Sequence, residues 1–304
     1  MEKHSHEHQH HHHDISSISK NKLFFVIIFN FIIALAEVIG GSISGSLSLI
    51  SDALHNLSDT ASLILSYVSI KISEKPKNKA KTYGYKRANI LAAFINSAAL
   101  IGISIFLGVQ ALEKLTSLKK INANIVIVVA LIGLLGNFLS VIILKKGAEK
   151  SLNVRSSYLH MLSDAMASLA VIISGVFIKY FAIYWIDSVL TIFINMLILK
   201  SSYNILKESI NILMQTTPVN LNMDDVKEQL LKIKEIKGVH HFHIWTLDEN
   251  NIVLEGHIEI DDILVSETRA ISDKIEHILN EDFHITHVVI QFESTSCEDN
   301  ICKI

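Results

Sequence analysis

Two histidine–aspartate pairs lie inside strongly apolar stretches of this 304-residue chain. His55 and Asp59 are four residues apart, and His160 and Asp164 repeat the same H-x-x-x-D spacing. On a helix, residues i and i+4 share one face. Two such helices facing each other would direct two imidazoles and two carboxylates to one point, a tetrahedral ligand set that Zn²⁺ accepts. We therefore predict a metal site; the alternative is a pair of structural salt bridges or helix-packing hydrogen bonds.

Two further acids, Glu37 and Asp52, also occupy apolar stretches. An ionisable group in hydrocarbon costs ~2.5–3.5 kcal/mol on insertion scales, so it normally faces the interior of a helix bundle. Both acids are candidates for an ion path, and Asp52 equally suits a bond to neighbouring backbone. Three amides in such stretches are expected to form hydrogen bonds between helices: Asn96, Asn137 and Asn195.

Six apolar stretches are long enough to cross a bilayer, which takes about 20 residues. The only prolines, Pro76 and Pro218, lie outside all of them. We predict an α-helical polytopic membrane protein and exclude a purely soluble enzyme. The expected spans are Leu23–Gly41, Leu47–Ile72, Ala88–Leu112, Ala123–Leu144, Tyr158–Phe181 and Tyr184–Leu206.

Loop charges predict the orientation. The N-terminal tail and the loops after the second and fourth spans carry 14 basic residues, against 4 on the opposite side. The positive-inside rule then places both termini in the cytoplasm, with the cell (inner) membrane as the expected location. A net charge of −3 argues against nucleic-acid binding. The chain contains no G-x-x-x-x-G-K-[ST] motif, so nucleotide binding is not expected either. Because the chain opens with polar histidines, we do not expect a secretory signal.

The first 14 residues hold seven histidines and are expected to be disordered. Such a tail would bind metal loosely near a cytoplasmic entrance, or be neutral. His6, Glu7 and His10 match a zincin spacing by accident, because nothing around them builds a catalytic cleft.

Beyond Leu206 the hydropathy falls, and the pattern predicts a small two-layer α+β domain of ~85 residues. We expect a helix at Asp224–Lys234, strands at Gly238–Leu247 and Asn251–Ile260, a helix at Ser266–Leu279 and a strand at His287–Phe292. The domains would be a histidine-rich tail (1–20), a transmembrane domain (21–208), a cytoplasmic domain for metal binding and dimerisation (209–296) and a cysteine-containing tail (297–304).

Longer motifs give the chain a specific resemblance over about residues 20–295. It resembles the cation diffusion facilitators, in their zinc-transporter branch, through Glu37 with Gly40 and Gly41 and through five segments: Ser46–Asp59, Thr82–Asn96, Ser156–Leu169, Val239–Leu247 and His287–Glu293. The resemblance implies a six-span homodimer with a ferredoxin-like, metallochaperone-like cytoplasmic domain. It also implies zinc transport by His55, Asp59, His160 and Asp164, with His55 favouring zinc over cadmium.

The resemblance also implies cytoplasmic metal sites at His240, His257 and Glu293. Gln291 stands where some relatives have a histidine, and Cys297 and Cys302 form a C-x4-C tail that could complete such a site with thiolates or remain reduced and mobile. The loop Ser73–Arg87 has no histidine, so no metal is expected there. The remaining histidines of this domain are expected at its surface or on strand faces: His241, His243, His277, His284 and His287.

These patterns together predict a secondary transporter rather than an enzyme. It would export Zn²⁺, or Co²⁺, Cd²⁺ or Fe²⁺, from the cytosol in exchange for protons by alternating access. The affinity order of divalent metals does not itself exclude those other ions. The alternative is a membrane-anchored zinc buffer or sensor that does not transport.

Overall fold

The computed structural model describes residues 20–73, 75–116, 120–148, 152–248 and 251–295. The chain divides into two compact units. The first unit contains residues up to Tyr67 together with Ile95–Ile205. The second contains Val68–Phe94 and the chain from Leu206 onward.

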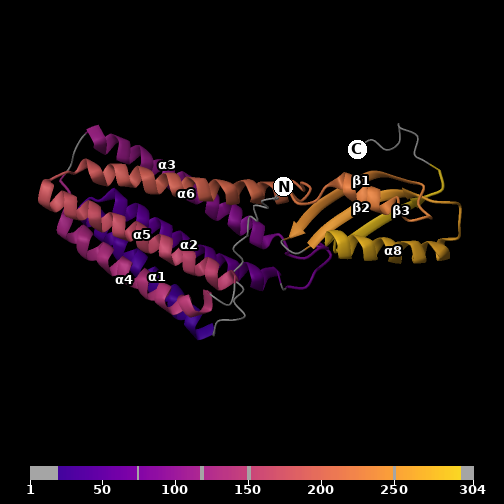
Figure 1. The fold of residues 1–304 in the computed structure, drawn as a ribbon, viewed down its shortest axis with the longest axis horizontal. Coiled ribbons are helices and arrows are strands. Elements are labelled where there is room, and N and C mark those ends of the chain that lie inside the picture. The colour runs from indigo at the N-terminus through magenta and orange to yellow at the C-terminus, as the bar shows by residue number, and fades with distance from the viewer. Residues whose placement is uncertain (1–19, 74, 117–119, 149–151, 249–250, 296–304) are drawn as a thin grey trace, which may run out of the picture. The chain divides into compact units, whose positions relative to one another are not determined.

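Six long helices account for most of the first unit (Figure 1). Their surfaces carry many exposed large apolar side chains, such as Phe106, Leu135 and Phe193, as expected for helices that face lipid. Each predicted span overlaps one of these helices. They are α1 (Lys20–Ser44), α2 (Leu47–Ser73), α3 (Ala88–Thr116), α4 (Ala123–Ala148), α5 (Leu152–Phe181) and α6 (Trp185–Leu213).

Four of these helices are long and apolar enough to cross a membrane. Among the described residues they are Ala88–Thr116, Ala123–Ile142, Met161–Phe181 and Trp185–Leu213, and α1 adds a shorter apolar helix at Ile28–Ser44. The remaining helix, α2, carries three ionisable side chains in its first half: Asp52, His55 and Asp59. The chain is therefore a multi-pass helical membrane protein, with four of the six expected spans meeting both criteria.

Helix α4 packs along both α1 and α5. Gly136 permits the close approach to α1, because a Cβ atom there would lie 2.3 Å from Cδ1 of Ile33. One apolar cluster also joins α2, α4, α5 and α6 through Leu49, Val126, Val171 and Ile194. The two helices that carry the predicted metal ligands, α2 and α5, thus share a packed core.

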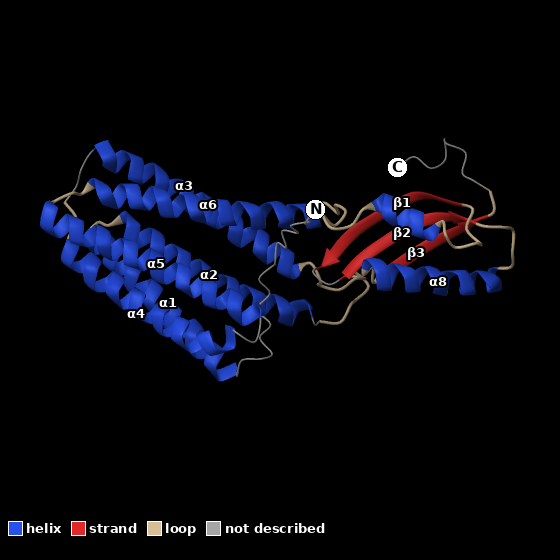
Figure 2. Ribbon diagram, in the orientation of Figure 1, coloured by secondary structure: helices blue, strands red, loops and turns tan. Residues whose placement is uncertain are grey.

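The second unit contains a three-stranded sheet with two helices, in the αββαβ order that the sequence predicts (Figure 2). The strand order is β1-β2-β3, with β1 antiparallel and β3 parallel to β2. The elements are α7 (Met223–Leu230), β1 (Gly238–Asp248), β2 (Asn251–Glu259), α8 (Val265–Phe283) and β3 (His287–Glu293).

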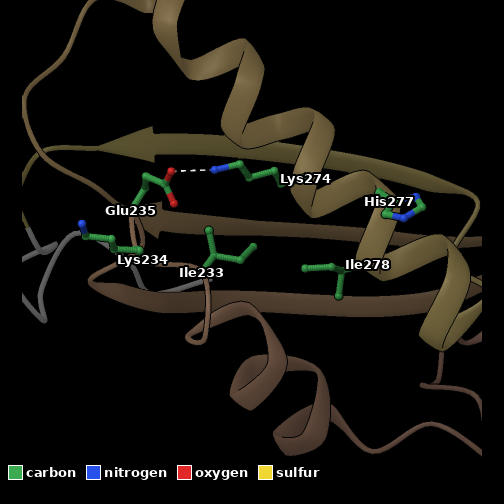
Figure 3. Close-up of a pocket in the computed structure, with 6 residues that line it drawn as sticks. All are labelled: Ile233, Lys234, Glu235, Lys274, His277 and Ile278. Carbon is green, nitrogen blue, oxygen red and sulfur yellow. Dashed lines mark hydrogen bonds and ion pairs between the residues drawn. The ribbon is translucent and has the colours of Figure 1, made fainter.

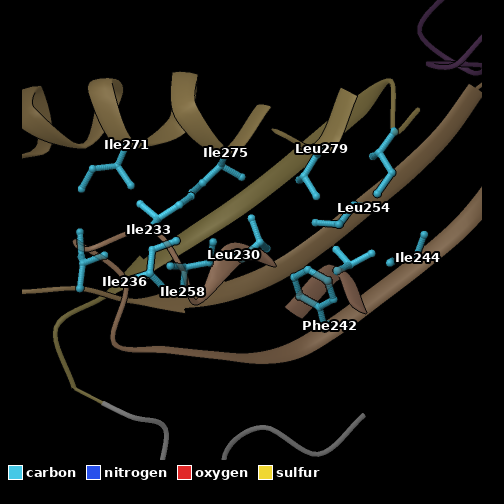
Figure 4. Packing of buried hydrophobic residues seen from close by; sticks show 13 residues of the cluster. Leu230, Ile233, Ile236, Phe242, Ile244, Leu254, Ile258, Ile271, Ile275 and Leu279 are labelled. Atoms are coloured by element: carbon cyan, nitrogen blue, oxygen red, sulfur yellow. The ribbon is translucent and has the colours of Figure 1, made fainter. Parts of the chain in front are cut away.

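An apolar stripe on α8 forms much of this unit's core (Figure 4). Ile271, Ile275 and Leu279 recur every four residues, so they share one helix face, and all are buried. They belong to one cluster with the buried Leu254 and Ile258 of β2. Burying each such side chain contributes about 1.5–3 kcal/mol. The unit therefore has a hydrophobic core of its own.

Local hydrogen bonds and backbone conformation define the ends of α7 and α8. The side chain of Asn222 accepts the backbone N–H of Asp224 and begins α7. Glu267 accepts the backbone N–H of Leu264 at 3.1 Å at the start of α8. His284, with φ 56°, closes α8 in the left-handed conformation.

Candidate metal centres

Helices α2 and α5 bring together three of the four predicted intramembrane ligands. Nε2 of His55 lies 3.4 Å from Oδ1 of Asp164 on α5 and 3.8 Å from Oδ2 of Asp59 on its own helix. Ligands 2.0–2.2 Å from one tetrahedral ion lie roughly 3.3–3.6 Å apart, so this spacing suits a shared metal. Asp164 is buried, whereas His55 and Asp59 are half-buried, so the group combines a sheltered carboxylate with two more accessible ligands.

The fourth predicted ligand, His160, lies on α5 one turn before Asp164. Its side chain is outside the part of the chain that the structure describes. The helical spacing places the backbone of His160 next to the group, and the geometry of the complete quartet stays a prediction.

Two further buried carboxylates lie on α1 and α2. Glu37 is fully buried, and its Oε2 accepts a hydrogen bond from Nδ2 of Asn56 at 3.0 Å. Asp52 is 1% exposed, and its Oδ2 accepts from Oγ of Ser168 at 2.9 Å. The sequence leaves two roles open for Asp52, in an ion path or in a bond to the neighbouring backbone. The bond that the structure shows goes instead to a side chain of another helix, α5. No local sequence pattern singles out Asn56 or Ser168.

A carboxylate that no sequence pattern singles out accepts hydrogen bonds from the residues at the start of α2. Asp187, fully buried on α6, accepts from Oγ of Ser46 at 2.5 Å, from Oγ of Ser48 at 2.6 Å and from the backbone N–H of Leu47 at 2.8 Å. An acid at this position satisfies free backbone donors and suits the positive end of the helix dipole. Asp187 therefore fixes the helix that carries His55 and Asp59. It lies in the first turn of α6, where an acid in sequence suggests only a local helix cap.

The amides expected to bond between helices behave differently from one another. Nδ2 of Asn96 on α3 donates to Oγ of Ser58 on α2 at 3.4 Å, as predicted. The side chain of Asn195 is buried and has no hydrogen-bond partner among the described residues, and Nδ2 of Asn137 has none either. For Asn195 the expectation is wrong, because neither polar atom of its side chain has a hydrogen-bond partner among the described residues.

The second unit holds a separate group of metal-type ligands. Nε2 of His240 lies 3.0 Å from Oε2 of Glu293, and Nδ1 of His257 lies 2.8 Å from Oε1 of the same carboxylate. The residues come from β1, β2 and β3, and their ligand atoms lie within 4.8 Å of one another. Nδ1 of His257 is buried and has no aligned hydrogen-bond partner among the described residues. Two imidazoles and a carboxylate fit Zn²⁺.

Glu293 is held in its ionised form. Partial burial raises the pKa of Glu293. The hydrogen bond from Gln291 and the neighbouring His257 and His240 lower this pKa by more than burial raises it, so the net pKa lies below the ordinary value of 4.5. Nε2 of Gln291 donates to Oε1 of Glu293 at 2.8 Å. Gln291 thus orients the carboxylate.

Two of the histidines expected at the surface or on strand faces, His241 and His243 of β1, lie beside this group. The strand pairing shifts between His240 and His243, and His241 has a left-handed φ of 51°. Its ring centroid lies 4.9 Å from that of His257 and 5.2 Å from that of His243. Both His241 and His243 are half-buried, whereas His277, His284 and His287 are exposed as expected. The alternation that suggested plain strand faces does not reveal this bulge.

The remaining predicted metal ligands, Cys297 and Cys302, lie outside the described residues, as does the histidine-rich tail. A pocket of the second unit lies elsewhere, between α8 and the segment after α7 (Figure 3). Its polar groups include Glu235, whose Oε1 is already paired with Nζ of Lys274 at 2.6 Å, and a single histidine, His277. That lining offers no second metal-type cluster.

The long apolar helices define a multi-pass membrane protein, and the group on α2 and α5 consists of side chains that could hold a divalent cation. The family model described as "Cation efflux transmembrane domain" matches residues 23–214, and "Cation efflux protein, cytoplasmic domain" matches residues 218–295. The chain belongs to the cation efflux family, as its motifs indicated.

Curated relatives are similar over most of their length. The "Cadmium, cobalt and zinc/H(+)-K(+) antiporter" of Bacillus subtilis is 38% identical over 85% of this chain and 84% of its own. The "Zinc transporter ZitB" of Escherichia coli is 34% identical over 89% and 86% of the two chains. A solved structure of the metal-bound C-terminal domain of the CzcD transporter is 32% identical, covering 24% of this chain and 99% of that one, with a TM-score of 0.22.

Proposed function

We propose that this protein is a secondary transporter that exports Zn²⁺ from the cytosol in exchange for protons. The main observation that supports this proposal is the approach of His55 on α2 to Asp164 on α5, with Asp59 one helical turn after His55. The family and the antiporters and zinc transporters among its relatives support the same activity. Co²⁺, Cd²⁺ and Fe²⁺ are alternative cargoes, because ligand affinity alone separates these ions poorly.

The transport site would be the quartet His55, Asp59, His160 and Asp164. Zn²⁺ needs neutral imidazoles and ionised carboxylates, so protons compete with the metal for the same lone pairs. Opening toward the neutral cytosol favours metal binding, and opening toward an acidic exterior favours its release. A bundle that alternates between the two openings moves Zn²⁺ one way and protons the other.

The proposed architecture is a homodimer in the cell (inner) membrane with six spans per protomer and both termini in the cytoplasm. The domain limits would be 1–20, 21–208, 209–296 and 297–304, with a ferredoxin-like domain in the third segment. The name of the cytoplasmic family domain, ZT_dimer, and the αββαβ order support this arrangement.

Vesicle transport tests the proposal. Full-length protein in proteoliposomes should take up Zn²⁺ when the interior is acidic, and Asp59→Ala or Asp164→Ala should abolish the uptake. Asp273→Ala, an exposed acid on α8, is the matched control and should transport normally. Undiminished transport by both quartet variants would refute the site, and a wild-type protein without metal flux would refute the function.

The cytoplasmic group supports a second candidate function, a membrane-anchored zinc buffer or sensor. His240, His257 and Glu293 would bind Zn²⁺, with Cys297 and Cys302 as additional ligands. A buffer requires no intramembrane ligands, so bound zinc without vesicle uptake would favour it over the exporter.

A further inference from the structure

Glu37 combines complete burial with an incomplete set of hydrogen bonds. Oε2 accepts from Asn56, but Oε1 has no hydrogen-bond partner among the described residues. Oε1 points to the backbone of α4 at Gly133, where a Cβ atom would lie 2.1 Å from it and 3.6 Å from Oγ of Ser168. Gly133 therefore makes room for the carboxylate, and Ser168 borders the same space.

Asp52 repeats this pattern on the neighbouring helix. Oδ2 accepts from Ser168, whereas Oδ1 is buried without a partner among the described residues. No lysine or arginine is among the buried residues that the structure describes in these helices. Two buried acids without a lysine or arginine partner cannot both carry a negative charge without a large desolvation cost, so we infer that a proton is the ligand that they lack.

Each acid is bonded to a neighbour of the predicted zinc quartet. Asn56, which donates to Glu37, follows His55 on α2. Ser168, which donates to Asp52, lies one helical turn after Asp164 on α5. A doubly charged ion in the quartet would be the largest local charge and would favour the ionised acids. Departure of the ion leaves these acids near the Asp164 carboxylate and favours protonation of the pair.

We propose that Glu37 and Asp52 bind one transported proton at a site separate from the zinc quartet. This inference rests on the proposed antiport. When Zn²⁺ leaves to the exterior, a proton from that side binds the pair. When Zn²⁺ enters from the cytosol, the proton is released to the cytosol. The pair therefore adds one proton per cycle to those that compete directly at the metal ligands. The other titratable groups near it are His55 and Asp164.

The coupling ratio tests the proposal in the full-length protein. Zinc uptake and proton counterflow are measured together in proteoliposomes with a zinc-sensitive and a pH-sensitive dye. Glu37→Gln keeps the shape and removes the acid, so the ratio should fall by one proton per Zn²⁺ while the quartet still binds one Zn²⁺ per protomer. Glu37→Asp should restore the ratio. An unchanged ratio in Glu37→Gln would overturn the proton site, whereas absence of zinc flux in wild type would overturn the antiport.

Infrared difference spectroscopy gives a readout that does not depend on transport. Removal of Zn²⁺ from the wild-type protein should produce the carbonyl stretch of a protonated carboxyl, shifted in D₂O and missing in Glu37→Gln. Gly133→Ala should weaken this signal by pushing against Oε1, whereas Gly108→Ala meets no atom within 4 Å and is the matched control. Absence of the band from wild type, or a band unchanged in Glu37→Gln, would contradict the proposal even where a variant folds poorly.

Discussion

His55 links the two helices of the proposed transport site, because its Nε2 approaches a carboxylate on each of them. Removing the imidazoles of both predicted pairs should therefore remove one zinc ion per protomer. The test is the metal content of the purified His55→Ala, His160→Ala variant by atomic emission. His277→Ala, His284→Ala removes two exposed histidines as a control. An equal metal count in all three proteins would argue for structural ion pairs at the quartet.

The cytoplasmic carboxylate gives a prediction about pH. The pKa of Glu293 is lowered below 4.5, so its ionised form stabilises the metal-free sheet above pH 4.5. That contribution should be lost as the pH falls below 4.5 through the folded-state pKa. Hydrogen exchange of β1–β3 in the full-length protein should accelerate over this range, and less so in Glu293→Gln. The same pH response in both proteins would exclude Glu293 as the cause.

Sequence spacing predicted site residues that form a pattern within one helix. It did not predict site residues whose partners lie far away in the sequence. The two H-x-x-x-D pairs are visible because an i, i+4 spacing already fixes a shared helix face. Ser168 is separated from Asp52 by 116 residues, and Asp187 from Leu47 by 140. Nothing in the local pattern of such residues distinguishes them from ordinary helix residues, so only the tertiary structure identifies their partners.

At the scale of elements, the start of α2 depends on one carboxylate of α6. Asp187→Ala would leave buried donors at Ser46, Leu47 and Ser48 without their acceptor and should destabilise the helical unit by about 2–4 kcal/mol. Asp187→Asn keeps one acceptor oxygen and should cost less. Thermal unfolding of the full-length protein in detergent measures both. Equal midpoints for wild type and Asp187→Ala would show that other contacts hold α2.

The elements themselves were largely predictable, because apolar length and period determine helices and strands before tertiary packing does. All six long helices and the αββαβ order appear where the sequence places them, with ends displaced by up to seven residues: α6 runs to Leu213 rather than Leu206, and α7 ends at Leu230 rather than Lys234. The bulge at His241 was not predicted, since a left-handed φ at a non-glycine residue costs of order 1–3 kcal/mol and needs surrounding structure to maintain it.

At the scale of the whole molecule, each of the two units carries its own group of side chains that could hold a metal ion. Transport and cytosolic binding should therefore be separable by changing parts of the chain outside the intramembrane group. Deletion of residues 1–14 removes seven histidines and none of the quartet. The truncated protein should keep most of its zinc turnover in vesicles while binding less zinc overall.

A length-matched variant separates the loss of imidazoles from the loss of chain. Replacing the seven tail histidines by asparagine keeps 304 residues and removes the metal ligands. If the tail only concentrates zinc, both changes should reduce uptake at low zinc and leave the maximal rate unaltered, because the quartet sets turnover. A large fall in the maximal rate with both proteins would instead make the tail part of the transport path. Lost binding in a protein that never moved zinc would identify a buffer.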